Sequence, residues 1–167
     1  SLSTRTMIVG GVDAMAKRVQ SLANDYGWWP DAYDAYINKD KDWFETNFGT
    51  SVEETEIADI FAVLSPEGLI DRGWVLEEGV APPDILPPPV IGKIRELAED
   101  MPLESLQAKS AVIEVGSNPM MIAVSRIVPY TREGIDPATL PLFVAGIAMT
   151  PDRLIDLGKT FLIDDVH

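Results

Sequence analysis

Apolar residues near the start of the chain recur at alternating intervals of four and three residues, the spacing of one face of a helix. The positions are Ile8, Val12, Met15, Val19, Leu22 and Tyr26. This pattern predicts a long helix over residues 1–26. Two interpretations of the stripe stay open. It can pack on the core of its own domain, or it can contact the same helix of a second copy, because a period near 3.5 residues also suits a two-helix contact.

The densest group of aromatic residues follows directly after this helix. Residues 25–36 contain two of the four tryptophans and three of the four tyrosines of the chain. Gly27 can end the long helix and Pro30 can open the next one, because glycine is common at helix ends and proline suits the first helical position. The segment therefore predicts a sharp turn between two helices.

The remaining patterns predict a short helix, a hairpin, a crossover and a run of strands. Five of the thirteen prolines lie within residues 81–90, where they disfavour regular helix and central strand. This segment is expected to be a surface crossover loop in polyproline conformation or, alternatively, a docking motif for a proline-reading partner. The predicted elements are a helix at 39–47 ended by Gly49, a capping pattern at Ser51, strands at 58–65 and 69–76, a helix at 90–100, strands at 110–115, 120–130 and 142–149, and a helix opened by Pro151.

This order of elements predicts an α+β fold. Hairpins and consecutive strands imply an antiparallel five-stranded sheet, with a long N-terminal helix and with helices on one side. Within residues 120–130, alternate residues are expected to occupy opposite faces of the sheet, with Arg126 on the same face as three apolar residues. Small sensory domains of the PAS and Cache type share this plan.

Composition narrows the classes of function. The chain has 167 residues, with 27 acidic and 13 basic ones and a net charge of −14. Nucleic acids and anionic lipids are bound mainly through Lys and Arg, so both classes of partner are disfavoured. Because the chain has no cysteine and one histidine, His167, thiol nucleophiles, disulfides, Cys/His zinc sites and a buried Ser-His-Asp triad are excluded. No apolar run reaches the ~18 residues of a membrane span. Since the chain starts at Ser1, we expect a segment excised from a longer protein.

Part of the aromatic segment resembles a family signature. The run from Asp25 to Tyr33 reads Asp-Tyr-Gly-Trp-Trp-Pro-Asp-Ala-Tyr, in which Trp29, Asp31 and Tyr33 occupy the positions of an Asp-aromatic-x-x-Trp-x-Asp-x-Tyr motif. This motif is typical of the fourth type of CHASE domain, an extracytoplasmic sensor of bacterial and archaeal histidine kinases and cyclic-dinucleotide enzymes. The resemblance continues through the predicted strands to a closing helix at residues 151–160.

The resemblance implies a role and an organisation for the whole chain. Residues 1–167 are expected to form a single extracytoplasmic sensor domain, periplasmic or extracellular, which has no catalytic activity and needs no cofactor. It would comprise a signalling and dimer helix (1–26), a PAS-like core (27–150) and an exit helix toward the membrane (151–167). Flanking helices would anchor the full protein in the membrane. In a homodimer, an unknown small-molecule ligand would favour one packing of the N-terminal helices.

Candidate ligand-binding residues come from the aromatic segment and from the predicted sheet. A small-molecule pocket needs apolar walls and a few fixed polar groups. The preferred interpretation of Trp29 and Tyr33, which are four residues apart, is one buried helical face, and that of Asp31 is a carboxylate at a helix N-terminus. If a ligand binds there, aromatic rings beside an acid favour a cationic or amine-bearing compound. The candidates are Trp28, Trp29, Tyr33 and Tyr36 as walls, Asp31 as a charge, and Arg126 and Tyr130 as groups facing them from the sheet.

The sequence gives weaker support to other classes of function. The acids Asp31, Asp34, Asp40 and Asp42 lack the spacing of an EF-hand loop, so a solvated acidic face is preferred over a metal site. A hydrolase with paired carboxylates is a further class, but no spacing selects a pair. The main alternative is an extracytoplasmic protein-interaction module without a small-molecule ligand, which would use the proline-rich loop or the long helix.

Overall fold

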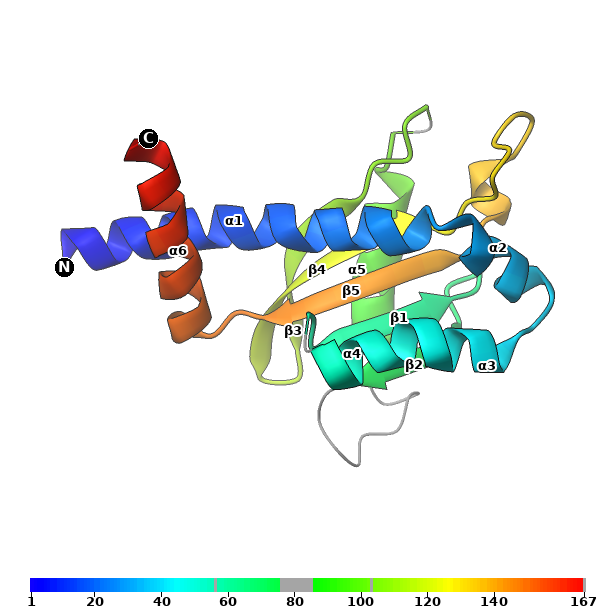
Figure 1. The fold of residues 1–167 in the computed structure, drawn as a ribbon, viewed down its shortest axis with the longest axis horizontal. Coiled ribbons are helices and arrows are strands. Elements are labelled where there is room, and N and C mark those ends of the chain that lie inside the picture. Colours follow the sequence, from blue (N-terminus) through cyan, green and yellow to red (C-terminus); the bar gives the residue numbers. More distant parts are fainter. Residues whose placement is uncertain (56, 76–85, 103, 167) are drawn as a thin grey trace.

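A five-stranded antiparallel sheet forms the centre of the molecule (Figure 1). The computed structural model describes residues 1–55, 57–75, 86–102 and 104–166. The strand order is β2-β1-β5-β4-β3, so the last strand in sequence lies in the middle. This sheet and the long N-terminal helix confirm the predicted α+β fold. The strands are β1 (Ile60–Leu64), β2 (Ile70–Val75), β3 (Lys109–Val115), β4 (Asn118–Arg126) and β5 (Leu142–Ala148).

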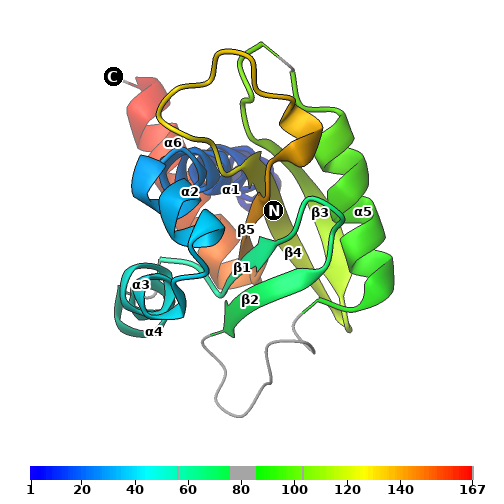
Figure 2. The same ribbon diagram turned by 90° about the vertical axis from the view of Figure 1, so that its right-hand side faces the viewer.

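Helices cover both faces of the sheet (Figure 2). One face carries α1 (Leu2–Gly27), α2 (Pro30–Ile37), α3 (Lys41–Phe44) and α4 (Thr50–Thr55), and the other carries α5 (Pro88–Glu99). The placement of α5 corrects the prediction of helices on one side. Alternate residues of β1 explain it, because Phe61 and Val63 pack toward α1 while Ile60 and Ala62 pack toward α5. A sheet that is apolar on both faces needs cover on both.

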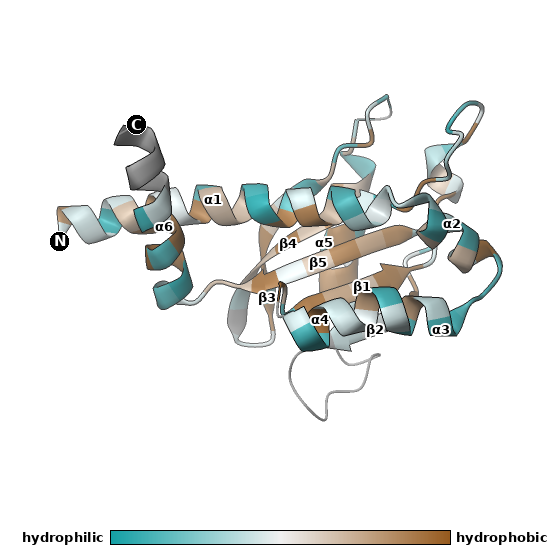
Figure 3. Cartoon of the chain, in the orientation of Figure 1, coloured by the Kyte–Doolittle hydropathy of each residue, from teal (hydrophilic) through white to brown (hydrophobic). Residues whose placement is uncertain are grey.

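The predicted alternation along β4 is confirmed. Met121 and Ala123 belong to the core beneath α1, whereas Ile122 and Val124 belong to the core beneath α5. Coloured by hydropathy, the strands are mostly apolar, whereas α3 and α4 include several hydrophilic residues (Figure 3). The apolar sheet therefore separates two hydrophobic layers.

The predicted helix over residues 1–26 is α1, and its apolar stripe has two environments. Met15 and Val19 are fully buried in the core beneath α1, between this helix and the sheet. For these residues the interpretation as core packing is confirmed, and neither is accessible to a second copy. The first turns of α1 extend beyond the sheet, where α6 (Pro151–Val166) crosses them (Figure 1).

The crossing of α1 and α6 depends on two glycines. A Cβ added to Gly11 would lie 2.0 Å from the carbonyl oxygen of Leu154, and one added to Gly158 would lie 1.8 Å from that of Met7. Only a residue without a side chain permits such an approach between helix backbones. The start of α1 and the end of α6 lie at the same end of the molecule (Figure 1).

The helix predicted to end at Gly49 continues through it. From α3 the chain passes through a π-helical turn, η1 (Glu45–Gly49), into α4. Gly49 leaves space for the indole of Trp74, whose Nε1 donates a hydrogen bond to Glu45 Oε2 at 2.9 Å. Ser51 lies inside the helix and donates to the carbonyl of Asn47 (3.0 Å), so the predicted capping pattern there is wrong.

The proline-rich segment is partly helical. Pro88 and Pro89 occupy the first two positions of α5, contrary to the expectation of no helix before residue 90. The first N–H groups of a helix have no acceptor within it, so proline is tolerated there. Residues 81–85 of the predicted crossover loop lie outside the described residues.

Candidate functional site

The junction of α1 and α2 divides the two adjacent tryptophans between separate clusters. Gly27 packs so closely on β4 that an added Cβ would lie 2.2 Å from Ser125 Oγ. The Gly27 carbonyl also accepts a hydrogen bond from Val128 N at 3.1 Å. Trp28 then caps the end of α1 and Trp29 caps the start of α2. Because the chain changes direction between them, the two indoles pack on different groups.

Trp29 packs among the aromatic rings of the core beneath α1. Its ring centroid lies 4.8 Å from that of Trp43 and 6.5 Å from that of Tyr26, both in edge-to-face geometry. Tyr33 is half-buried and contacts this core as well as the smaller cluster around Val128. These placements favour the interpretation of Trp29 and Tyr33 as packing residues.

Trp28 packs on the smaller cluster, which consists of Leu106, Val128 and Leu140. The Cζ atom of Arg132 lies 4.9 Å from the centroid of the Trp28 ring. Within the described residues, Trp28 Nε1 is buried and has no hydrogen-bond partner. A cation therefore already covers one face of this predicted ligand wall.

The polar candidates do not converge on the tryptophans. Asp31 lies exposed in the first turn of α2, and Tyr130 is 89% exposed in the loop after β4. Arg126, the last residue of β4, donates a hydrogen bond from Nη1 to the Leu140 carbonyl at 2.9 Å. Burial lowers the pKa of the Arg126 guanidinium. By strand alternation Arg126 shares the face of Ile122, which is opposite to that of the aromatic core.

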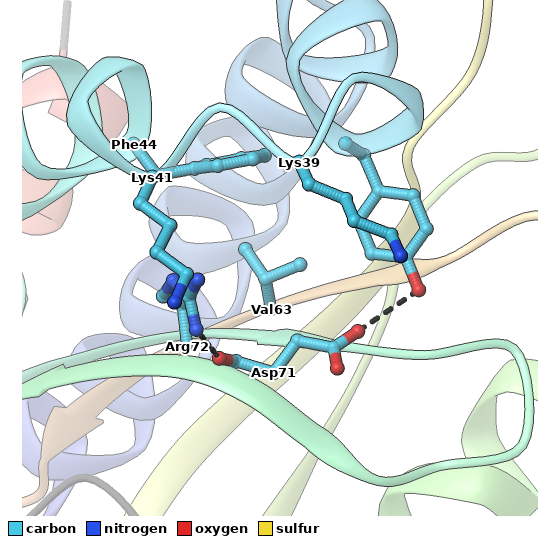
Figure 4. A pocket seen from close by; sticks show the side chains of 7 residues that line it. Lys39, Lys41, Phe44, Val63, Asp71 and Arg72 are labelled. Carbon is cyan, nitrogen blue, oxygen red and sulfur yellow. Dashed lines mark hydrogen bonds between the residues drawn. The ribbon is translucent and has the colours of Figure 1, made fainter.

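A pocket that sequence reasoning missed lies where the turn between α2 and α3 faces β1 and β2. Its volume is about 240 Å³. Figure 4 shows Lys39 and Lys41 extending from this turn toward β2, with Val63 between them. Of the seven predicted site residues, only Tyr36 lines it. The lining residues are Tyr36, Lys39, Lys41, Phe44, Val63, Asp71 and Arg72.

The backbone at the pocket rim has an unusual conformation. Lys39 has a φ of 54°, in the left-handed region. It follows the C-cap residue Asn38, and the amides of Lys39 and Asp40 donate to the carbonyls of Tyr36 (3.2 Å) and Ala35 (2.9 Å). This is a Schellman motif with lysine at the position where glycine is usual. The motif turns the chain so that the lysine side chain reaches the pocket.

A hydrogen bond joins the two walls of the pocket. The hydroxyl of Tyr36 on α2 donates to Asp71 Oδ2 on β2 at 2.9 Å (Figure 4). Burial and this hydrogen bond raise the pKa of Tyr36 above its usual value of 10.0. The tyrosine therefore stays protonated and serves as a donor to the carboxylate. Arg72 donates from Nη1 to the backbone carbonyl of Asp71.

The charges around the pocket differ from those of the whole chain. Lys39, Lys41 and Arg72 contribute three positive charges, and Asp71 contributes one negative charge. Phe44 and Val63 are buried and provide an apolar floor. The arrangement can hold a small molecule that presents both an apolar body and negative charge.

The sequence alone indicates some of the positive residues of this pocket. Residues 39–42 alternate Lys and Asp, and the two lysines stand out in a chain with 13 basic residues against 27 acidic ones. The prediction of an acidic face took no account of these two lysines. The contribution of Arg72 depends on the pairing of a distant hairpin with this turn, which residue spacing does not reveal.

A second polar arrangement connects the sheet to α6. The carboxylate of Asp59, immediately before β1, forms a two-pronged ion pair with Arg153 in the first turn of α6. Arg153 Nη2 lies 3.0 Å from Asp59 Oδ1, and Nη1 contacts Oδ2. Asp59 Oδ2 also accepts a hydrogen bond from Ala148 N at 2.7 Å. The ends of β1 and β5 are thereby tied to the start of α6.

Two features are absent from the part of the chain that the structure describes. No group of three or more acidic, histidine or cysteine side chains within it is arranged to hold a metal ion. Among the same residues, no helix combines the length and apolar character needed to cross a bilayer.

Comparison with known proteins identifies one family. The model of the CHASE4 domain matches residues 12–167. This match confirms the resemblance carried by Trp29, Asp31 and Tyr33. A comparison with curated proteins gives no match.

Proposed function

Because the chain belongs to the CHASE4 family of sensor domains, we propose that it is the extracytoplasmic ligand-sensing domain of a membrane signalling receptor. The receptor would be a histidine kinase, a diguanylate cyclase or a cyclic-dinucleotide phosphodiesterase. The observation that carries ligand sensing is the pocket of about 240 Å³ between the α2–α3 turn and β1–β2. Its apolar floor and convergent charged groups are the features of a small-molecule site.

The position of the pocket supports a route for the signal. Val63 of β1 lies in the pocket floor, and Asp59 just before β1 holds Arg153 of α6. If β1 can occupy two positions, a ligand that binds more tightly to the protein with β1 in one of them would favour that position and would shift α6 with it. Only such a difference in affinity moves the equilibrium between the two states. The first turns of α1 cross α6 and share its end of the molecule (Figure 1). Both helices would continue into membrane spans.

The proposed homodimer would use surfaces other than the buried part of the stripe. Met15 and Val19 are inside the protomer, but Leu2 and Val9 on α1 are 80% and 67% exposed. A second copy is proposed to contact these exposed residues. Analytical ultracentrifugation of Val9→Glu tests the contact, because a charge there should shift a dimer toward monomer. An unchanged sedimentation coefficient would remove this surface from the proposal.

The sensor proposal is tested by a metabolite screen on the purified chain. Compounds that raise the midpoint of thermal unfolding are titrated while backbone amide chemical shifts are recorded. A sensor ligand should shift the amides of residues 36–44 and 63–72. Shifts confined to other elements, or the absence of any binding compound, would contradict the proposed site.

A pocket-filling variant sharpens this test. Val63→Phe places a larger side chain in the pocket floor and should abolish binding of the compound found. Val112→Phe, the same change at a half-exposed position on β3, is the matched control and should leave binding unchanged. If Val63→Phe does not fold, the amide shifts of the unmodified chain decide.

A further inference from the structure

We propose that this pocket selects a small organic anion, whose negative charge is held by Lys39, Lys41 and Arg72. The inference rests on the proposed function of the same pocket as the ligand site. It differs from the sequence-based expectation of an amine ligand, which relied on Asp31 beside the aromatic rings. Asp31 is exposed and is absent from the pocket lining.

The first support is the concentration of positive charge. The whole chain carries a net charge of −14 and has only 13 basic residues, yet three of them line one pocket of about 240 Å³. With these three positive charges and the one negative charge of Asp71, the lining has a net charge of +2, and a cleft with a net charge of one sign raises the local concentration of oppositely charged ligands. On an otherwise acidic surface, this pocket would attract anions that the surrounding surface repels.

The carboxylate in the pocket, Asp71, already accepts a hydrogen bond from Tyr36, and this is the second support. Among the described residues that line the pocket, Asp71 is the only carboxylate, and its Oδ2 accepts the hydrogen bond of the protonated Tyr36 hydroxyl. Arg72 uses Nη1 for the Asp71 backbone carbonyl, and a guanidinium has five N–H donors. Donors for a carboxylate are therefore more numerous here than acceptors for an amine.

The third support is the backbone conformation of Lys39. A non-glycine residue in the left-handed region is strained, and such residues concentrate at functional sites. Glycine would satisfy the Schellman motif with less strain. A lysine at this position is explained if its side chain contacts a ligand.

The floor of the pocket restricts the anion to an organic one of modest size. Phe44 and Val63 are apolar and line this floor, so an apolar body would face them. Pockets for drug-sized ligands have about 300–1,000 Å³, and this one is smaller. The expected ligand carries a carboxylate or similar anionic group on a short apolar body.

Three probes of nearly equal shape and different charge test the inference on the whole chain. Benzoate, benzamide and benzylamine are titrated while amide shifts of residues 36–44 are recorded. Benzoate should bind at least about fivefold more tightly than benzamide, because its charge gains charge-assisted hydrogen bonds. Benzylamine should bind most weakly. Raising the salt concentration from about 0.01 to 0.15 M should weaken benzoate and leave benzamide unchanged.

Variants assign the selectivity to the pocket. Lys41→Gln and Arg72→Gln should each weaken benzoate binding about three- to tenfold and leave benzamide unchanged. Lys93→Gln is the matched control. It removes the same charge from an exposed lysine on α5, across the sheet, and should change neither affinity.

The outcomes separate this inference from the proposed function. Equal binding of benzoate and benzamide at residues 36–44, or tighter binding of benzylamine, overturns the anion inference and leaves a ligand pocket in place. An equal loss of benzoate binding in Lys93→Gln overturns it as well, because bulk charge would then explain the selectivity. If none of the three probes binds, the anion inference fails, and the metabolite screen separately decides the proposed function.

Discussion

Replacing Lys39 with glycine should stabilise the protein and weaken anion binding at the same time. The left-handed conformation of Lys39, with φ of 54°, costs a non-glycine residue about 1–2 kcal/mol. Glycine removes that cost but lowers the free energy of unfolding by about 0.5–1 kcal/mol, because a glycine residue has more conformational freedom in the unfolded chain. Since the Lys39 side chain is exposed, little packing is lost. The expected net gain is about 0.5–1 kcal/mol.

The gain is measurable by thermal unfolding. For a protein of 150–250 residues, a change of 1 kcal/mol shifts the midpoint by about 2–4 °C, so Lys39→Gly should raise it by about 1–4 °C. Benzoate affinity should fall about three- to fivefold, because one exposed charge pair is lost. Asn38→Gly is the control: its φ is −84°, so glycine relieves no strain and should lower the midpoint.

Two results would refute the reasoning. A lower midpoint for Lys39→Gly would show that the backbone of Lys39 carries no strain that glycine relieves. An unchanged benzoate affinity would show that the strained position does not serve the ligand. Lys39→Asn distinguishes backbone from side chain, because asparagine tolerates the left-handed conformation and carries no charge.

Three further predictions concern the coupling of elements around the sheet. Asp59→Asn removes the ion pair to Arg153 of α6 and should lower the free energy of unfolding by about 1–3 kcal/mol in denaturant unfolding. In a full-length receptor the same variant should uncouple output from ligand binding. Preserved output would contradict the proposed route. Gly158→Ala places a methyl group against the Met7 carbonyl and should cost about 1–3 kcal/mol, with an unchanged midpoint arguing against the close crossing. Tyr36 has a raised pKa, so the stability it contributes is present below pH 10 and is lost as the pH rises toward that pKa. Tyr36→Phe, which no longer binds Asp71, should therefore show a smaller loss of thermal stability between about pH 8 and 11; identical pH profiles would refute this.

Long and regular patterns in the sequence predict their elements correctly. The stripe from Ile8 to Tyr26 forms α1, and the apolar runs at residues 58–65 and 142–149 contain β1 and β5. Their spacing reports directly which side chains face the core, because helix and strand periods are local properties. The aromatic motif also identified the family, since its residues are adjacent in sequence.

The structure differs from the sequence-based prediction where one residue type has two structural uses. A glycine at position 49 predicts a helix end, but Gly49 provides space for Trp74, a residue of the hairpin. Consecutive prolines disfavour helix, but Pro88 and Pro89 occupy the first two positions of α5. The apolar residues on both faces of β1 require cover on both faces, but which helix supplies that cover depends on the tertiary contacts with α5.

In the candidate site, too, some residues follow from local sequence and others from tertiary contacts. Local sequence specifies the two helices around Gly27 and Pro30 and supplies Tyr36, Lys39 and Lys41 in one short stretch. Packing of the β1–β2 hairpin against that stretch brings Asp71 and Arg72 to it and creates the pocket. Periodicity is a property of neighbouring residues, so it can be read along the chain. A pocket depends on which distant surfaces meet, and that follows from burial of the whole sheet.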